Sequence, residues 1–136
     1  MYKLARALDT EVGAFFPAAP DGHPLPHVSR ASEASEIAIS GSRRTYKLLS
    51  GRAPDRVLEP LLVTVEPVEE VEEPYSHEGE EFAYVLFGEL IFVVDGAEHR
   101  LGEGDSIHFR STLPHSVHND TDEPVHALWV LTPRLI

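Results

Sequence analysis

The chain has 136 residues, 42% of them hydrophobic, which is enough for one domain with a buried core but too few for two full domains. Its formal net charge of −12 disfavours contact with phosphate backbones, so we do not expect the chain on its own to bind nucleic acid. Cysteine is absent, which excludes disulfides, zinc–thiolate sites, iron–sulfur clusters and thiol nucleophiles, and leaves His, Asp, Glu and Tyr as possible metal ligands.

The N-terminal part of the chain predicts a short helical segment followed by a linker. No secretory signal pattern opens the chain and no apolar run is long enough to cross a bilayer, so we expect a cytoplasmic protein without membrane contact. Residues 3–16 have apolar side chains at helical spacing, with an N-cap at Asp9-Thr10 between two short helical pieces. The next stretch is rich in Pro, Gly and Asp, so residues 17–29 are assigned to a linker.

From about residue 37 onward, the hydrophobic pattern has a period of two and predicts β-strands. Short β-rich runs are separated by Gly, Pro, Asp and Asn; they are IAIS, TYKLLS, LEPLLVTVEP, EFAYVLFGELIFVVDG, EHRL, DSIHF, HSVH and VHALWVLT. Turns are indicated at Gly88 and at Asp95-Gly96, the latter a strong hairpin signal. Many short strands without helices between them predict an all-β, antiparallel sandwich or small barrel.

The run that begins near residue 77 has two different faces. Side chains alternate along a strand, so the odd-numbered residues 77–85 share one face, which is small and apolar beyond Glu81. This face is expected to line a barrel interior with polar groups near one mouth. Phe82, Tyr84 and Leu86 form a bulky opposite face, which needs another sheet or another subunit to cover it.

Three potential metal ligands occur in two separate runs. His77 and Glu81 lie in the run that begins near residue 77, and His115 lies on a later strand. If these two segments pair across the barrel, His77, Glu81 and His115 converge. Two imidazoles and one carboxylate suit Fe, Mn, Ni or Zn and leave coordination positions open. The alternative is a metal-free pocket in which these groups hydrogen-bond a small anion or one another.

The spacing of these residues resembles the two motifs of the cupin barrel. H-x3-E-x6-G, beginning at His77, resembles the first motif; G-D at residues 104–105 and P-H-x3-N, beginning at Pro114, resemble the second. The resemblance covers about residues 30–133. It implies an antiparallel jelly-roll barrel, or double-stranded β-helix, over residues 30–136.

The sequence departs from the family pattern at Tyr75, where the first motif usually has another histidine. His77, Glu81 and His115 remain, and the resemblance implies that they hold a divalent transition metal (Fe, Mn, Ni or Zn). Three further residues are assigned to ligand binding. Tyr75 is expected as a phenol in the pocket wall. Tyr46 could equally well belong to the core, and Asn119 could instead make hydrogen bonds at the end of a strand.

Among cupins, the chain most resembles the sensor domain of bacterial regulators that carry an N-terminal helix-turn-helix. Residues 1–16 resemble the last helices of such a DNA-binding domain, whose recognition helix is missing here. The resemblance implies a homodimeric sensor that binds a small-molecule effector. The alternative is a metal-dependent enzyme, oxygenase-, epoxidase- or isomerase-like, acting on a small acid or phosphonate. A similar epoxidase that makes fosfomycin also joins a helix-turn-helix-like domain to a cupin with a two-His, one-Glu iron site.

Overall fold

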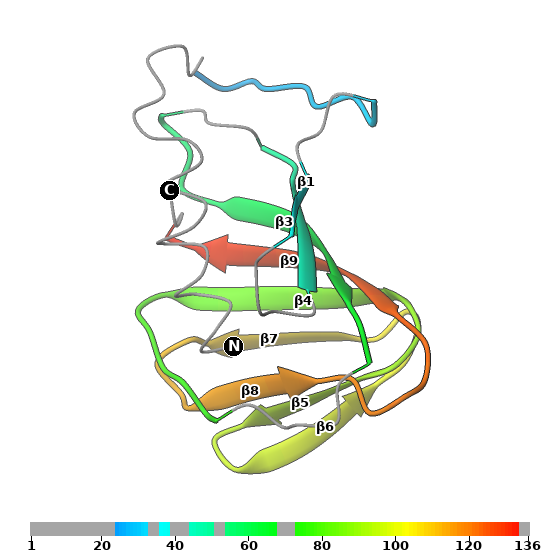
Figure 1. Ribbon diagram of the computed structural model, residues 1–136. Coiled ribbons are helices and arrows are strands. Elements are labelled where there is room, and N and C mark those ends of the chain that lie inside the picture. The colour runs from blue at the N-terminus through cyan, green and yellow to red at the C-terminus, as the bar shows by residue number, and fades with distance from the viewer. Residues whose placement is uncertain (1–23, 33–35, 39–43, 51–53, 68–72, 134–136) are drawn as a thin grey trace.

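A computed structural model describes residues 24–32, 36–38, 44–50, 54–67 and 73–133, and this part of the chain is all-β (Figure 1). It contains strands and connecting segments but no helix. The helical segment predicted for residues 3–16 lies outside the described residues. Residues 24–29, at the end of the predicted linker, form neither helix nor strand.

The strands occur where the alternating pattern predicts them. They are β1 (Glu36–Ala38), β2 (Arg44–Leu48), β3 (Glu59–Val65), β4 (Glu80–Phe87), β5 (Leu90–Val94), β6 (Ala97–Leu101), β7 (Ser106–Arg110), β8 (His115–His118) and β9 (Val125–Thr132). The predicted hairpin between β5 and β6 is confirmed: Asp95 and Gly96 have φ angles of 51° and 81°, as expected for the turn type that suits twisted strands.

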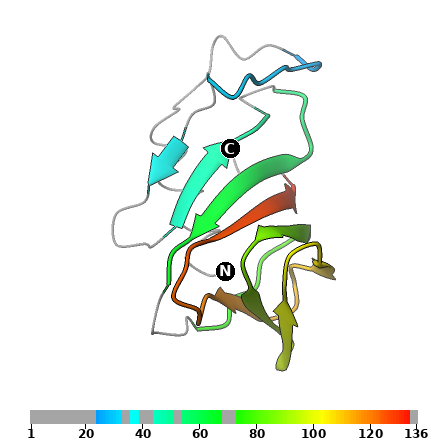
Figure 2. The same ribbon diagram turned by 90° about the vertical axis from the view of Figure 1, so that its right-hand side faces the viewer.

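Two antiparallel sheets form the domain. One has the order β1-β2-β3-β9-β4-β7 and the other has the order β6-β5-β8. The chain passes from one sheet to the other four times, between β4 and β5, β6 and β7, β7 and β8, and β8 and β9, which is the jelly-roll arrangement that the sequence predicts. In Figure 1 the three-stranded sheet lies below β7, at the end away from β1, and Figure 2 gives the perpendicular view.

The core lies between the inner faces of the two sheets. Buried residues alternate with partly buried or exposed ones along β3 and β9, and Ala83 and Val85 of β4 are buried as predicted. The rings of Phe92 and Trp129 lie 5.3 Å apart and join the two sheets. Apolar side chains therefore fill the middle of the barrel.

One row of inward-facing residues carries charge. The register places Glu81 of β4 opposite Leu131 of β9, and Leu131 opposite Glu59 of β3. Both glutamates are at most 2% exposed. Glu59 accepts a hydrogen bond from Arg56, 3.3 Å away, so a buried ion pair lies at this end of the barrel.

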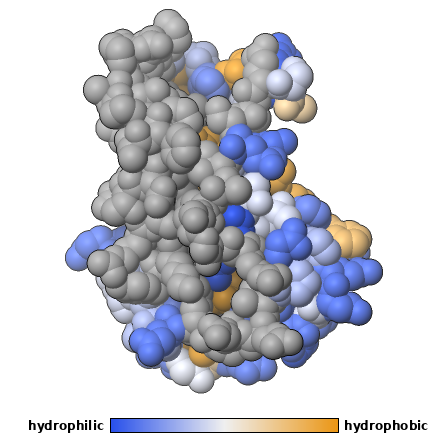
Figure 3. Space-filling model, viewed as in Figure 1, coloured by the Kyte–Doolittle hydropathy of each residue, from blue (hydrophilic) through white to orange (hydrophobic). Residues whose placement is uncertain are grey.

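The outer face of β4 is apolar and exposed, as the alternation predicts. Of the three residues predicted on this face, Tyr84 and Leu86 are 38% and 48% exposed, and Phe82 is partly buried. Phe87, which follows a register shift in β4, is 45% exposed. A groove of about 280 Å³ lies at the start of β4, and residues along it include Leu58, Glu80, Phe82, His108 and Val130. In the view of Figure 3, hydrophilic residues predominate among those described and hydrophobic ones appear in smaller groups. No helix long and apolar enough to span a membrane occurs among the described residues.

Candidate metal centre

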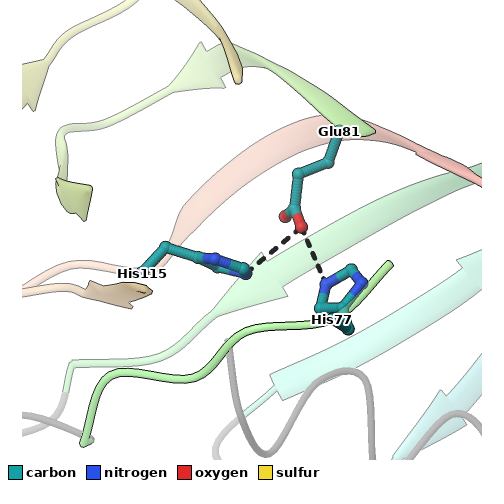
Figure 4. A group of neighbouring side chains, drawn as sticks. All are labelled: His77, Glu81 and His115. Carbon is teal, nitrogen blue, oxygen red and sulfur yellow. Dashed lines mark ion pairs between the residues drawn. The ribbon is translucent and has the colours of Figure 1, made fainter. Parts of the chain in front are cut away.

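His77, Glu81 and His115 converge at one end of the barrel, as the motif spacing predicts (Figure 4). Their potential ligand atoms all lie within 4.8 Å of one another. The Nε2 atoms of His77 and His115 lie 2.9 and 3.2 Å from the same carboxylate oxygen, Oε2 of Glu81. The side chains of Glu81 and His115 are fully buried, whereas that of His77 is 14% exposed, so the cluster meets solvent on the His77 side.

Backbone hydrogen bonds bring the three ligand-bearing segments together. Tyr75 and His115 exchange a pair of N–H···O bonds of 2.9 and 3.0 Å. The N–H of His77 donates to the carbonyl of Ser111, and the N–H of Ser111 donates to the carbonyl of Gly79, each over 2.9 Å. The segment before β4 is thus tied to the connection between β7 and β8, which places His77 beside His115.

Gly79 permits this close approach. Its φ of +99° is rarely adopted by residues with a side chain, and an added Cβ would lie 1.6 Å from the backbone oxygen of Thr132. The segment between His77 and Glu81 therefore crosses the end of β9 without room for a side chain at this position.

The hydrogen bonds of the two imidazoles determine which nitrogen faces the cluster. Nδ1 of His77 lies 3.0 Å from the carbonyl oxygen of Glu78, and Nδ1 of His115 lies 2.6 Å from that of Leu113. A carbonyl oxygen only accepts hydrogen bonds, so we assign the hydrogen to each Nδ1. In the neutral rings, Nε2 then presents a lone pair to the cluster.

These lone pairs make the residues a good fit for a metal ion. Both Nε2 atoms are buried and neither makes a well-aligned hydrogen bond, although each lies close to Oε2 of Glu81. Two lone pairs aimed at a carboxylate oxygen repel it unless a proton or a metal cation lies among them. Backbone carbonyls that fix Nδ1 also orient metal-ligating histidines in general.

The charge state of the cluster follows from its own contacts. Burial acts to raise the pKa of Glu81, but the neighbouring His115 and His77 and the hydrogen bond from Trp129 outweigh it and lower the pKa from 4.5 to about 2. Burial acts to lower the pKa of His77, but its contact with ionised Glu81 outweighs that effect and raises the pKa above 6.5. The carboxylate is therefore an anion at neutral pH, as a metal ligand must be.

Neighbouring side chains that the sequence did not single out also hold the cluster. Oγ of Ser111 donates to Oε2 of Glu81 over 2.8 Å, and Nε1 of Trp129 donates to Oε1 over 3.0 Å. The ring of Phe109 packs edge-on against His115, with a centroid separation of 5.0 Å. Trp129 is a core residue, and only the register of β4 with β9 reveals its contact with Glu81.

The other predicted site residues occupy different places. The Tyr75 ring lies beside the cluster, its centroid 5.5 Å from that of His77. Tyr46 is 1% exposed and belongs to the hydrophobic core. Asn119 is fully buried and bonds to backbone oxygens of Val65 and Glu123, a strand-end role. Ligand binding by these three residues remains a prediction.

The chain is similar to cupin domains in sequence. Residues 61–131 match the Cupin_2 family, described as the cupin domain. The HTH-type transcriptional regulator PuuR of Escherichia coli (strain K12) is 28% identical over 121 residues, a match that covers 88% of this chain and 63% of the regulator. The chain thus spans less than two thirds of the length of the curated relatives it matches.

Solved structures with the same fold include regulators and other proteins. The Cupin_2 domain of an XRE family transcriptional regulator from Enterobacter cloacae has a TM-score of 0.60 and 22% identity, covering 67% of this chain and 97% of that one. KdgF from Halomonas sp. has a TM-score of 0.66 and 18% identity, covering 79% and 95%. The structure of Fe(II) HppE has a TM-score of 0.66 and 25% identity, covering 95% and 72%.

Proposed function

This chain belongs to the cupin family, and we propose that it is the small-molecule-sensing domain of a transcriptional regulator, with a divalent transition metal held by His77, Glu81 and His115. The similarity to PuuR, which extends over 88% of this chain, supports the regulatory role. A regulator acts beside DNA, so the proposal places the protein in the cytoplasm, with DNA contact made by the full-length regulator rather than by this acidic domain.

The observation that carries the metal proposal is the pair of buried Nε2 atoms aimed at Oε2 of Glu81 without a well-aligned hydrogen bond. Two histidines and one carboxylate form a donor set typical of Fe(II), Mn, Ni or Zn. When bound, such an ion supplies a Lewis-acidic centre whose open positions accept oxygen or nitrogen atoms of a small molecule. The protein contributes the fixed imidazoles, the anionic carboxylate and the apolar surroundings.

The position of the cluster suggests how effector binding is transmitted. Glu81 belongs to the six-stranded sheet, whereas His115 begins β8 of the three-stranded sheet. A ligand at this junction contacts both sheets, and it favours the sheet arrangement that binds it better. A change in the arrangement of the sheets moves the outer face of β4, and this movement is transmitted to a neighbouring domain or subunit that contacts it.

We also propose that the domain is a homodimer whose copies meet at the outer face of β4. The exposure of Tyr84 and Leu86 on the outer face of β4, with the exposed Phe87 at the end of the same strand, supports this surface. Sedimentation of wild type and Leu86→Glu tests it: the wild type should be dimeric and the variant monomeric. Equal sedimentation of the two would contradict this choice of surface.

A second candidate function is a metal-dependent enzyme acting on a small acid or phosphonate. The likeness to Fe(II) HppE over 95% of this chain favours it. Cupin folds serve both purposes, so the chemistry of the loaded site must distinguish them.

Metal analysis of the untagged protein, purified without chelator, tests the proposed centre. We expect near-stoichiometric Fe, Mn, Ni or Zn in the wild type and none in His77→Ala. His108→Ala is the matched control, because His108 also pairs with a glutamate, Glu80, at 2.8 Å but lies outside the cluster with its side chain 60% exposed. This control should keep its metal.

The outcomes separate the two functions. Iron, together with ligand-dependent oxygen consumption, would favour the enzyme, whereas small-molecule binding without turnover would favour the sensor. Absence of metal after incubation with Fe(II), Mn(II), Ni(II) and Zn(II) would overturn the metal centre and leave a metal-free pocket.

A further inference from the structure

Different neighbours hold the two carboxylate oxygens of Glu81. Ser111 donates its hydroxyl hydrogen to Oε2 over 2.8 Å, and Trp129 donates its indole N–H to Oε1 over 3.0 Å. None of the three residues is more than 1% exposed, so water does not compete for these bonds. An indole N–H can only donate, so this contact on Oε1 persists whatever protonation states its neighbours adopt.

The two oxygens also face different surroundings. Oε2 is the oxygen near the Nε2 atoms of His77 and His115, at 2.9 and 3.2 Å. Oε1 is bonded to Trp129, whose ring packs against Phe92 in the core with a centroid separation of 5.3 Å. A carboxylate that chelates a metal must turn both oxygens toward the ion, and the bond to Trp129 opposes that rotation.

We propose that Trp129 and Ser111 are positioning residues that hold Glu81 as a single-oxygen metal ligand through Oε2. This inference rests on the metal centre proposed above and adds a limit on its coordination. A glutamate that occupies one coordination position instead of two leaves an additional position for the effector or substrate.

Ser111 has a second connection to the same site. Its backbone carbonyl accepts from the N–H of His77, and its backbone N–H donates to the carbonyl of Gly79. One residue therefore fixes the backbone beside the His77 ligand and the side chain of the Glu81 ligand. Ser111→Ala removes only the hydroxyl and leaves both backbone bonds in place, which makes it a specific probe.

The test compares Co(II) binding by four proteins. Trp129→Phe removes the indole donor but keeps an aromatic ring in the core, and Ser111→Ala removes the hydroxyl donor. Phe92→Leu is the matched control, because it alters the packing of the Trp129 ring without removing a hydrogen bond to Glu81. Affinity for Co(II) alone is measured by competition with a chelating dye, and coordination is followed by the visible absorption of the bound ion.

We expect Trp129→Phe and Ser111→Ala each to bind Co(II) about 10- to 100-fold more weakly than wild type, the usual effect of removing a residue that orients a ligand. Trp129→Phe should also show weaker visible bands, because binding through both oxygens raises the coordination number. Phe92→Leu should unfold at a lower temperature but keep the wild-type affinity and spectrum.

Two results would overturn the positioning role while leaving the metal centre intact. One is wild-type affinity and spectrum in both Trp129→Phe and Ser111→Ala. The other is a loss of affinity in Phe92→Leu equal to that in Trp129→Phe, which would assign the effect to packing. If Trp129→Phe does not fold, Ser111→Ala decides the question. Failure of the wild type to bind Co(II) would instead refute the metal centre, and this inference with it.

Discussion

At the scale of single residues, the candidate centre depends on hydrogen bonds that select the atoms facing one another. Backbone carbonyls accept from Nδ1 of both histidines, and this leaves Nε2 for the cluster. Glu81 receives two hydrogen bonds that do not involve the histidines. The result is a buried anion that accepts hydrogen bonds from Ser111 and Trp129, and its ionisation is coupled to the stability of the fold.

The depressed pKa of Glu81 predicts a specific acid sensitivity of the metal-free protein. Its pKa is about 2 in the folded chain against an ordinary 4.5, so ionised Glu81 stabilises the fold above pH 4.5, and this contribution is lost as pH falls toward 2. The full contribution is on the order of 3 kcal/mol. Urea unfolding of wild type and Glu81→Gln at several pH values measures it. Between pH 5 and pH 2, the free energy of unfolding of the wild type should fall steadily relative to that of Glu81→Gln. A difference that does not change with pH would contradict the assignment.

At the scale of elements, the segment before β4 places His77 in the candidate site. His77 and Gly79 precede β4, which begins at Glu80. Their positions are fixed by hydrogen bonds to Ser111 and by the close approach of Gly79 to Thr132. The position of His77 in the candidate centre therefore depends on one turn whose backbone excludes a side chain at Gly79.

Substitution of Gly79 should damage the site through the backbone. In Gly79→Ala, the Cβ would lie 1.6 Å from the oxygen of Thr132, so the segment must move and carry His77 away from Glu81. We expect a stability loss of about 1–3 kcal/mol and a loss of metal binding. Thermal unfolding and metal titration measure the two effects.

Gly104→Ala is the matched control for this substitution. Gly104 also has a positive φ, +85°, but an added Cβ there would meet no atom within 4 Å. It should lose some stability through backbone strain alone and keep its metal affinity. Equal metal affinity in Gly79→Ala and Gly104→Ala would show that the close approach to Thr132 is not needed for the site.

At the scale of the whole molecule, the cluster joins the two sheets. Glu81 lies in the six-stranded sheet and His115 in the three-stranded sheet, and the rings of Phe92 and Trp129 connect the same sheets through the core. A metal bound to both would stabilise the closed barrel, because the unfolded chain does not hold the three ligands together.

Metal removal should therefore destabilise the barrel. With free metal at 100 times its dissociation constant, binding adds about 2.7 kcal/mol to the free energy of unfolding. Chelation should lower the thermal midpoint of the wild type but leave that of metal-free His77→Ala unchanged. Identical unfolding of the wild type with and without metal would mean that the cluster does not bind the ion in the folded state.

The sequence by itself determined the class of fold and the identity of the three clustered residues. Alternation with period two and the turn at Asp95-Gly96 act locally, so they locate strands and a hairpin without knowledge of distant contacts. The motif spacing, through its resemblance to cupins, also predicted that His77, Glu81 and His115 converge.

Only the tertiary structure decided what surrounds those residues. Ser111 and Trp129 lie 30 and 48 residues from Glu81 along the chain, and they meet it because of strand register. Tyr46 and Asn119 have side chains suited equally to a pocket or to a structural role, and their contacts place them in the core and at a strand end. The physical reason is that these hydrogen bonds and packing contacts depend on pairing between strands far apart in the chain, such as β4 with β9, which no local turn signal encodes.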